Sequence, residues 1–470
     1  MKAWWRAGAI WMIATGCLLP ASAAAINPLE CREWFEDAEQ AVQAAGIRDA
    51  GARRIEHYPH LRATRRLAAI RPASNRQAAG QLWLELLADE ALSGWRSELL
   101  RLPESAPLTP RDRTRRVERM EACVQGLVEV STATGVPELE IPDAYADWMR
   151  TLGLYPVTRW LATPSVHGYR RDMRARLEAE PPEARMLFTP PALKGNPPYP
   201  AALPDNALEL PLPGSGAREA MLTHYAPVLA VARTNPANLP GTVGLAGGRA
   251  EVLTRTTTAY QWVSWTRFQG EYLLQLNYQF WFSERPAQNP MDPYAGRLDG
   301  LIWRVTLQPN GHVLAYDSIH PCGCYHKVYP VSSELRPRNP DKAGQPVFYP
   351  ERAPDARRER VQLTLEPDTH YIVEVDSVTE NDLPARQYRL RDANHLRHLP
   401  DGAGYGSLYD GKGLVPESRR GERWLLWPLG VPSAGAMRQP GHHAIAFIGK
   451  RHFDDPAVLE DVLEPRPFLR

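Results

Sequence analysis

Beyond its first 25 residues, the sequence has no uninterrupted apolar run of the roughly 18 residues that a membrane-spanning helix needs. Charge of one sign is not in excess either, because 55 Lys and Arg residues stand against 54 Asp and Glu residues. The chain also lacks a glycine-rich phosphate loop, a Gly-x-Ser-x-Gly elbow and a His-Glu-x-x-His motif. These absences argue against a transmembrane segment in the mature chain, a nucleic-acid partner and the commonest nucleotide, serine-hydrolase and zinc-protease sites.

The composition is otherwise that of a folded protein. Hydrophobic residues make up 43% and charged residues 23% of 470 residues, a length that suits two to four domains. Proline is abundant at 45 residues, nearly twice the ordinary share of about 5%, and there are 14 Trp residues. Most basic residues are Arg, which we interpret as genome composition rather than as recognition.

The first 25 residues have the features of a secretory signal peptide. Lys2 and Arg6 precede an apolar stretch over 7–19, and the small residues 21–23 form a cleavage site. We therefore expect export to the periplasm and an envelope component as partner. Lipid anchoring through Cys17 is the alternative outcome of the same segment.

Cleavage leaves four cysteines, Cys31, Cys123, Cys322 and Cys324. In an oxidising compartment they suggest two disulfides, for which three connectivities exist. Cys31 and Cys123 lie on the apolar faces of two predicted helices, while Cys322 and Cys324 are neighbours in a distant segment. This favours the pairs Cys31–Cys123 and Cys322–Cys324.

The patterning predicts an α+β protein. Helical spacing of apolar residues and helix-start signals dominate 26–189, which we assign to a helical domain. Residues 190–214 form a proline-rich linker. Residues 215–470 are predicted to form a larger, mainly antiparallel β domain that ends in a short helix capped by Asp455 and Pro456.

Alternation with a period of two marks the strands of the second domain. Residues 272–282 have one apolar and one mostly polar face, as in a half-buried strand. The dipeptide Asn310-Gly311 is a strong hairpin signal. Further short strands are predicted at 424–427 and 444–448. The predicted hairpins pair 260–267 with 272–282, 301–307 with 313–319, and 361–365 with 371–375.

The densest group of chemically active side chains is the segment 320–326. His320, Cys322, Cys324 and His326 alternate there, and on a straight strand the two histidines would be about 20 Å apart. A bend at Pro321 and Gly323 would let both sulfurs and one imidazole converge. His443 is a candidate distant ligand, and thiolate with imidazole suits zinc or copper.

Other interpretations of these residues remain open. Cys322 and Cys324 form a structural or redox-active disulfide in one of them, and in another Cys324 with His326 is the thiolate–imidazolium pair of a thiol-dependent enzyme. Asp317 is expected to be a solvated hairpin residue, although it could orient His320. Finally, the protein could be a non-catalytic binding module, in which the Arg-rich stretch 48–76 or the Trp-rich sheet contacts the partner.

Four blocks carry a resemblance to known sequences. They are LLQLNYQFWFSERP at 273–286, GRLDGLIWRVTL at 296–307, YDSIHPCGCYH at 316–326 and GAMRQPGHHAIAFIGKRHFDDP at 435–456. With them the chain resembles a family of uncharacterised exported proteins of Gram-negative bacteria. The resemblance implies an envelope location and no particular activity, so it assigns no catalytic residue.

Overall fold

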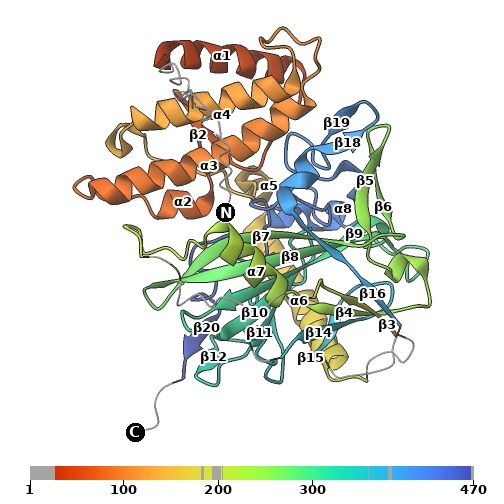
Figure 1. The fold of residues 1–470 in the computed structure, drawn as a ribbon. Coiled ribbons are helices and arrows are strands. Elements are labelled where there is room, and N and C mark those ends of the chain that lie inside the picture. Colours follow the sequence, from red (N-terminus) through yellow and green to blue (C-terminus); the bar gives the residue numbers. More distant parts are fainter. Residues whose placement is uncertain are drawn as a thin grey trace, which may run out of the picture.

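A computed structural model describes residues 27–180, 185–192, 203, 205–357, 359–378 and 384–466. The predicted signal peptide and much of the predicted linker lie outside these ranges. The α+β prediction is confirmed, because helices dominate the N-terminal part and mainly antiparallel sheets the larger C-terminal part. In Figure 1 the N-terminal helices form a layer above the sheets.

The N-terminal layer is built around a core of aromatic and aliphatic side chains that includes Phe35, Trp83 and Trp95. Asn27 caps the first helix by accepting from the Leu29 N–H at 3.0 Å. The elements of this layer are α1 (Pro28–Ala44), β1 (Arg53–Ile55), β2 (Tyr58–Ala63), α2 (Arg65–Ala69), α3 (Gln77–Arg101), α4 (Arg113–Glu129) and the short helix η1 (Ala133–Gly135).

The predicted disulfide between Cys31 and Cys123 is confirmed. It joins α1 to α4, and the two Cα atoms are 5.3 Å apart. Both residues belong to the buried core of the layer, as their positions on apolar helix faces predict.

Two sheets form the C-terminal part. The larger has the order β13-β11-β10-β9-β8-β7-β17 and the smaller β15-β14-β4-β3-β16. The larger contains β7 (Thr258–Phe268), β8 (Glu271–Arg285), β9 (Gly296–Leu307), β10 (Val313–Ile319), β11 (Lys327–Pro330), β13 (Val347–Phe348) and β17 (Arg389–Asp392). The smaller contains β3 (Arg185–Thr189), β4 (Val228–Ala232), β14 (Val361–Leu365), β15 (Ile372–Ser377) and β16 (Ala385–Gln387).

A shared apolar core lies between these two sheets. It takes Leu276 and Tyr278 from β8, Leu229 from β4 and Leu363 from β14. Helices α6 and α7 pack against the same core through residues such as Met173. The remaining elements are α5 (Asp147–Leu152), α6 (Tyr155–Leu177), α7 (Ser215–His224), α8 (Arg423–Leu426), β5 (Thr242–Ala246), β6 (Arg249–Leu253), β12 (Leu335–Pro337), β18 (Leu399–Asp401), β19 (Gly404–Gly406), β20 (Leu463–Pro465), and the short helices η3 (Pro236–Asn238), η4 (Ala393–Arg397), η5 (Pro416–Ser418) and η6 (Trp427–Leu429).

The three predicted hairpins are confirmed as the antiparallel pairs β7–β8, β9–β10 and β14–β15. The prediction that β8 is only half-buried, with its polar face exposed, is wrong, however. Its polar face is buried as well, because Gln275 bonds to Ser264 of β7 and Thr306 of β9. Polar side chains that bond across neighbouring strands can be buried at low cost.

Three short elements differ from the prediction. Residues 424–427 are helical, as parts of α8 and η6, and 444–448 form no strand beyond one bridge between Ala444 and His452. The segment after Pro456 is a series of turns that ends in β20. There Val458 and Leu459 enter an apolar core, and β20 pairs with β12, so tertiary contacts override the helix-start signal.

The predicted division into domains at 190–214 is not decided by these observations, although two contacts cross it. Strand β3 lies before the predicted linker but pairs with β4 and β16 of the smaller sheet. Leu208 and Leu210 lie after its start but belong to the core of the N-terminal layer. Within the described residues, no helix has both the length and the apolar character needed to cross a membrane.

Candidate functional site

The segment 320–326 forms a tight turn. The Gly323 N–H donates to the His320 carbonyl at 2.8 Å, and the His320 N–H donates to the Cys324 carbonyl at 3.0 Å. Gly323 has a φ of +89°, a value that favours glycine. The backbone therefore bends where the sequence predicts it.

Replacement of Gly323 by Ala is expected to lower the free energy of unfolding by at least about 2 kcal/mol. A Cβ atom there would be 2.3 Å from the Ala444 carbonyl oxygen and would add to the cost of the positive φ. Gly270 is a matched control, because its φ is +87° but a Cβ would meet nothing within 4 Å. Urea denaturation of Gly323→Ala and Gly270→Ala separates the cost of the clash from that of the backbone conformation. An equal loss of unfolding free energy in the two variants would contradict the expectation.

The two cysteines of this turn are free, buried thiols, so the predicted Cys322–Cys324 disulfide is wrong. The Cys324 N–H donates to the Cys322 sulfur at 3.3 Å. Hydrogen bonding between the two side chains and burial raise the pKa of the Cys324 thiol well above its ordinary value. A thiol of raised pKa is a poor nucleophile, so the geometry does not support the thiol-enzyme interpretation.

The two histidines of the segment point to different carboxylates. His320 Nδ1 is 3.4 Å from Asp299, which also accepts from His370 at 2.7 Å and Arg420 at 3.2 Å. Burial lowers the pKa of His320 to about 4, and its Nε2 atom has no hydrogen-bond partner among the described residues. His320 is therefore a neutral side chain in the interior.

His326 belongs to a second buried network. Its Nε2 atom is 3.2 Å from Asp317, and Asp317 is held by two hydrogen bonds from Arg304. The expectation that Asp317 is solvated is wrong, because its side chain is fully buried. It also contacts His326 rather than His320. The guanidinium of Arg304 lies 3.5 Å from the ring centroid of Phe453.

His443 is buried near the turn, and burial lowers its pKa to about 3. Its ring and that of His326 lie edge-on to Phe453 at 6.2 and 6.3 Å. Among the residues described here, no group of three or more His, Cys, Asp or Glu side chains is arranged to hold a metal ion. The zinc or copper site stays a prediction, and the geometry offers it no converging ligand set.

Tyrosines and cations surround the outer side of the turn. The guanidinium of Arg285 lies 5.1 Å from the ring centroid of Tyr371 and 5.7 Å from that of Tyr325. Lys327 is buried with its Nζ atom 4.8 Å from the Tyr371 centroid, and burial lowers its pKa to about 7. Neither Arg285 nor Lys327 stands in a recognisable catalytic or metal-ligand pattern, so the sequence alone gave no signal for their place beside these rings.

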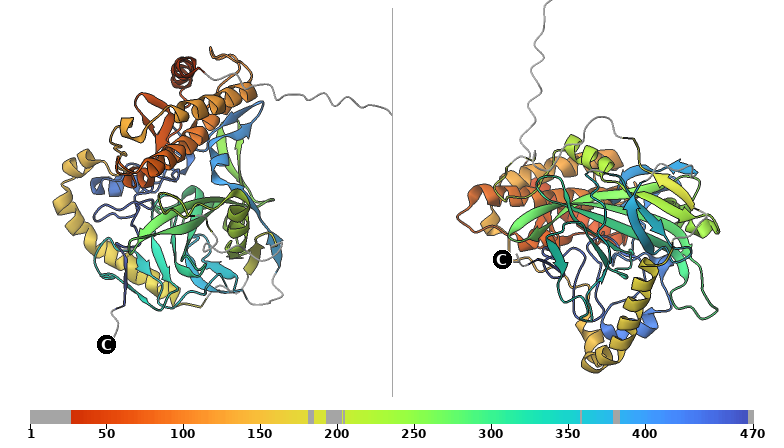
Figure 2. Two further views of the ribbon diagram at one scale, coloured as in Figure 1. Left: turned by 60° about the vertical axis from the view of Figure 1, so that its left-hand side comes forward. Right: turned by 90° about the horizontal axis from the view of Figure 1, so that it is seen from below.

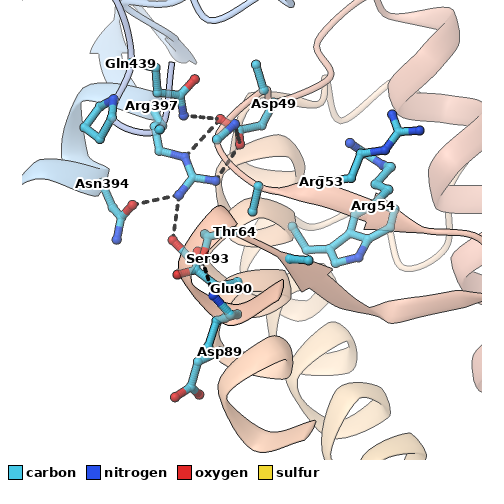
Figure 3. Close-up of a pocket in the computed structure, with 18 of the residues that line it drawn as sticks. Asp49, Arg53, Arg54, Thr64, Asp89, Glu90, Ser93, Asn394, Arg397 and Gln439 are labelled. Carbon is cyan, nitrogen blue, oxygen red and sulfur yellow. Dashed lines mark hydrogen bonds and ion pairs between the residues drawn. The ribbon is translucent and has the colours of Figure 1, made fainter. Parts of the chain in front are cut away.

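A cleft of about 1580 Å³ opens between the N-terminal layer and the C-terminal part. Its walls come from α1, residues 48–57, α3, strand β7 and the C-terminal loops near 392–397 and 439–442. Part of it is shown in Figure 3. Clefts of this kind between packed layers are frequent ligand sites.

One ion pair joins the two walls. Arg397 of η4 donates to both carboxylate oxygens of Asp49 at 2.9 and 2.6 Å and to Ser93 of α3 at 2.8 Å. Figure 3 shows this guanidinium reaching from the C-terminal part to Asp49 and Ser93. Burial alone raises the pKa of Asp49, but attraction to Arg397 outweighs it and holds this pKa below its ordinary value. The pair is thus one of the contacts that hold the two walls together.

A second buried carboxylate, Glu98 of α3, anchors the Arg-rich stretch. It accepts from Arg54 and Arg62 at 2.7 Å each and from the Asp49 N–H at 2.6 Å. The stretch 48–76 is therefore only partly the solvated surface that its sequence suggests, because Arg62 is fully buried. Arg53, by contrast, stays exposed and lines the cleft.

Strand β7 supplies the opposite wall. Trp262 and Trp265 line the cleft from it, and Tyr409 and Trp95 line it from other elements. Trp262 is half-buried, whereas the other three are buried. The Arg-rich stretch and the Trp-rich sheet, which the sequence offers as separate candidate surfaces, thus face each other across one cleft. Asp49 and Arg397 gave no sequence signal, because only the fold brings them together.

Comparisons with protein families, with curated proteins and with solved structures give no match to this chain. The resemblance drawn from its sequence blocks therefore stays a prediction. What bears on function is the geometry described above.

Proposed function

We propose that this protein is an exported, non-catalytic binding module of the cell envelope, and that its cleft holds a glycan strand. The observation that carries the proposal is the volume of about 1580 Å³ between the Arg-rich stretch and the Trp-bearing strand β7. That volume is larger than most sites for small molecules, which measure about 300–1,000 Å³. It suits several units of a polymer.

The charges of the lining favour a polar ligand of low net charge. Nine Lys or Arg side chains and eight Asp or Glu side chains line the cleft. Several of them already neutralise each other, as in the pairs of Asp49 with Arg397 and of Glu39 with Arg54. A groove for nucleic acid would instead present a clear excess of unpaired cations.

Aromatic and polar side chains together are what a sugar polymer requires. The flat face of an indole packs against the C–H face of a sugar ring, and Trp262 is the half-buried indole in the lining. Arg53 and Lys412 are exposed in the same lining and supply hydrogen-bond donors for hydroxyl groups. Glycan chains of peptidoglycan that are freed of their charged stem peptides are the ligand that this proposal tests first.

Soluble glycan chains of peptidoglycan, freed of their stem peptides, are expected to bind the purified protein. Trp262→Ala should raise the Kd about tenfold, the loss of about 1.4 kcal/mol of contact energy. Isothermal titration calorimetry measures both. The double variant Arg53→Ala with Lys412→Ala replaces only exposed side chains and should also weaken glycan binding. Trp160→Ala is the matched control, because this exposed indole lies outside the cleft.

Equal affinity of the wild type, Trp262→Ala and the double variant would overturn the proposal, as would no binding at all. Tighter binding of single-stranded DNA than of the glycan would also overturn it. Circular dichroism of each variant shows whether the fold is retained.

A further inference from the structure

Large apolar side chains are exposed together on three short segments. Eight of the fourteen exposed large hydrophobic side chains in the described part of the chain lie on or beside α5, α6 and α8. We call them the tryptophan patch. Its members are Trp148, Leu152, Leu154, Val157, Trp160, Leu161, Trp424 and Leu425.

The patch combines residues that are far apart in the sequence. The Ala146 N–H donates to the Gly430 carbonyl at 2.8 Å, and Arg150 donates to the Leu429 carbonyl at 3.0 Å. A Cβ atom on Gly153 would be 2.5 Å from Pro428 Cα. These contacts hold α5 and the start of α6 against η6, which directly follows α8. Both views in Figure 2 place these helices at the edge of the molecule.

The exposure is a property of the fold rather than of loose packing. The same segments bury Met149 and Arg150, and the Arg150 guanidinium lies 4.6 Å from the Tyr145 ring centroid. The inner side is thus well packed, while the indoles of Trp148, Trp160 and Trp424 are 64%, 78% and 70% exposed. Soluble monomeric proteins rarely expose so many apolar groups in one place unless the surface binds something.

We propose that the tryptophan patch docks on the surface of a lipid bilayer with anionic headgroups. Trp is enriched at membrane interfaces, where its ring lies at the level of the headgroups. Helices with an apolar outer face and a polar opposite face lie in the plane of that interface rather than across it. This agrees with the finding that no described helix is long and apolar enough to span a membrane.

The charges around the patch favour anionic lipid. Arg159 is exposed between Val157 and Trp160, and the guanidinium of Arg423 lies 4.8 Å from the ring centroid of Trp424. The acidic group at the edge, Asp147, is paired with Lys450 at 2.7 Å. Within the described part of the chain, neither arginine forms an ion pair with a carboxylate, so the patch presents indoles together with basic groups, a combination that suits a negatively charged membrane surface.

Vesicle binding tests the proposal with a protein that lacks residues 1–25, all of which precede the described residues. Vesicles of phosphatidylethanolamine and phosphatidylglycerol should sediment the protein and shift its Trp fluorescence to the blue. The triple variant Trp148→Ala, Trp160→Ala and Trp424→Ala should partition at least tenfold less. The double variant Arg159→Ala with Arg423→Ala should bind these anionic vesicles more weakly than the wild type does. Its binding to vesicles of pure phosphatidylcholine should equal that of the wild type.

The control removes exposed apolar side chains elsewhere. Leu29→Ala with Met291→Ala should bind as the wild type does, because both residues are exposed outside the patch. A wild type that stays in the supernatant would overturn the proposal. So would a wild-type dimer in analytical ultracentrifugation that the triple variant abolishes, because the patch would then bind a second copy of the chain. The glycan affinity of the triple variant should not change, which keeps this test separate from that of the cleft.

Discussion

Replacement of Arg304 by Met is expected to lower the free energy of unfolding at pH 7 by about 3–5 kcal/mol. Arg304 and Asp317 form a fully buried ion pair between β9 and β10. Without the guanidinium, the Asp317 carboxylate keeps only His326 as a side-chain partner in the described structure. The cost is that of a buried charge left without its counter-ion, and urea denaturation measures it.

Two further variants give this expectation a control and a rescue. Arg96 and Glu121 form an exposed pair, so Arg96→Ala should change the stability by no more than about 1 kcal/mol. Adding Asp317→Asn to Arg304→Met removes the uncompensated charge and should restore part of the loss. A double variant that is less stable than Arg304→Met alone would contradict this account of the pair.

The same pair predicts a dependence on pH. Burial alone raises the pKa of Asp317, but attraction to Arg304 outweighs it and holds this pKa below its ordinary value of 3.8. A lowered folded-state pKa stabilises the protein above the unfolded-state pKa, and this contribution is lost as the pH falls through the folded-state value. Without Arg304 the burial that raises this pKa is largely unopposed, so Asp317 of the variant takes up a proton at a higher pH than Asp317 of the wild type. The stability difference between the wild type and Arg304→Met should therefore narrow as the pH falls, beginning above the ordinary pKa of 3.8.

Removal of the Cys31–Cys123 disulfide is expected to cost about 4–5 kcal/mol. The bond closes a loop with a sequence separation of 92 residues, and its loss restores the conformational freedom of that loop to the unfolded chain. The variant Cys31→Ala with Cys123→Ala should therefore unfold at a lower urea concentration. We expect α1 to detach first, because the bond joins it to α4.

Reductant separates this effect from changes in packing. Dithiothreitol should destabilise the wild type by a similar amount and should leave the double Ala variant unchanged, because Cys322 and Cys324 are free thiols. A wild type that reductant does not affect would contradict the expectation.

Local features of the chain were predicted well because local geometry determines them. Asn310 and Gly311 connect β9 and β10 whatever surrounds them, and a glycine at 323 permits the bend of the 320–326 turn. The pairing of Cys31 with Cys123 followed from the apolar faces of two helices. Each of these predictions depends on a few neighbouring residues or on the period of one helix.

Predictions about single polar side chains failed where the partner was distant. Asp317 was expected in solvent, but Arg304 on the neighbouring strand binds it, and Arg304 itself donates to the Phe453 carbonyl. A disulfide between Cys322 and Cys324 was one of several interpretations of these neighbouring residues, and both are free thiols in the turn. The exposed fraction of a side chain depends on which elements cover its strand, and the sequence pattern of that strand does not contain this information.

The sequence by itself determined the class of fold, the hairpins of the larger sheet and the disulfide of the helical layer. Only the tertiary structure decided which charges meet. Asp49 and Arg397 are 348 residues apart in the sequence and 2.6 Å apart at the wall of the cleft. The tryptophan patch likewise joins residues near 150 to residues near 424. Periodicity reports which side of an element is apolar, but only the packing of distant elements determines what that side faces.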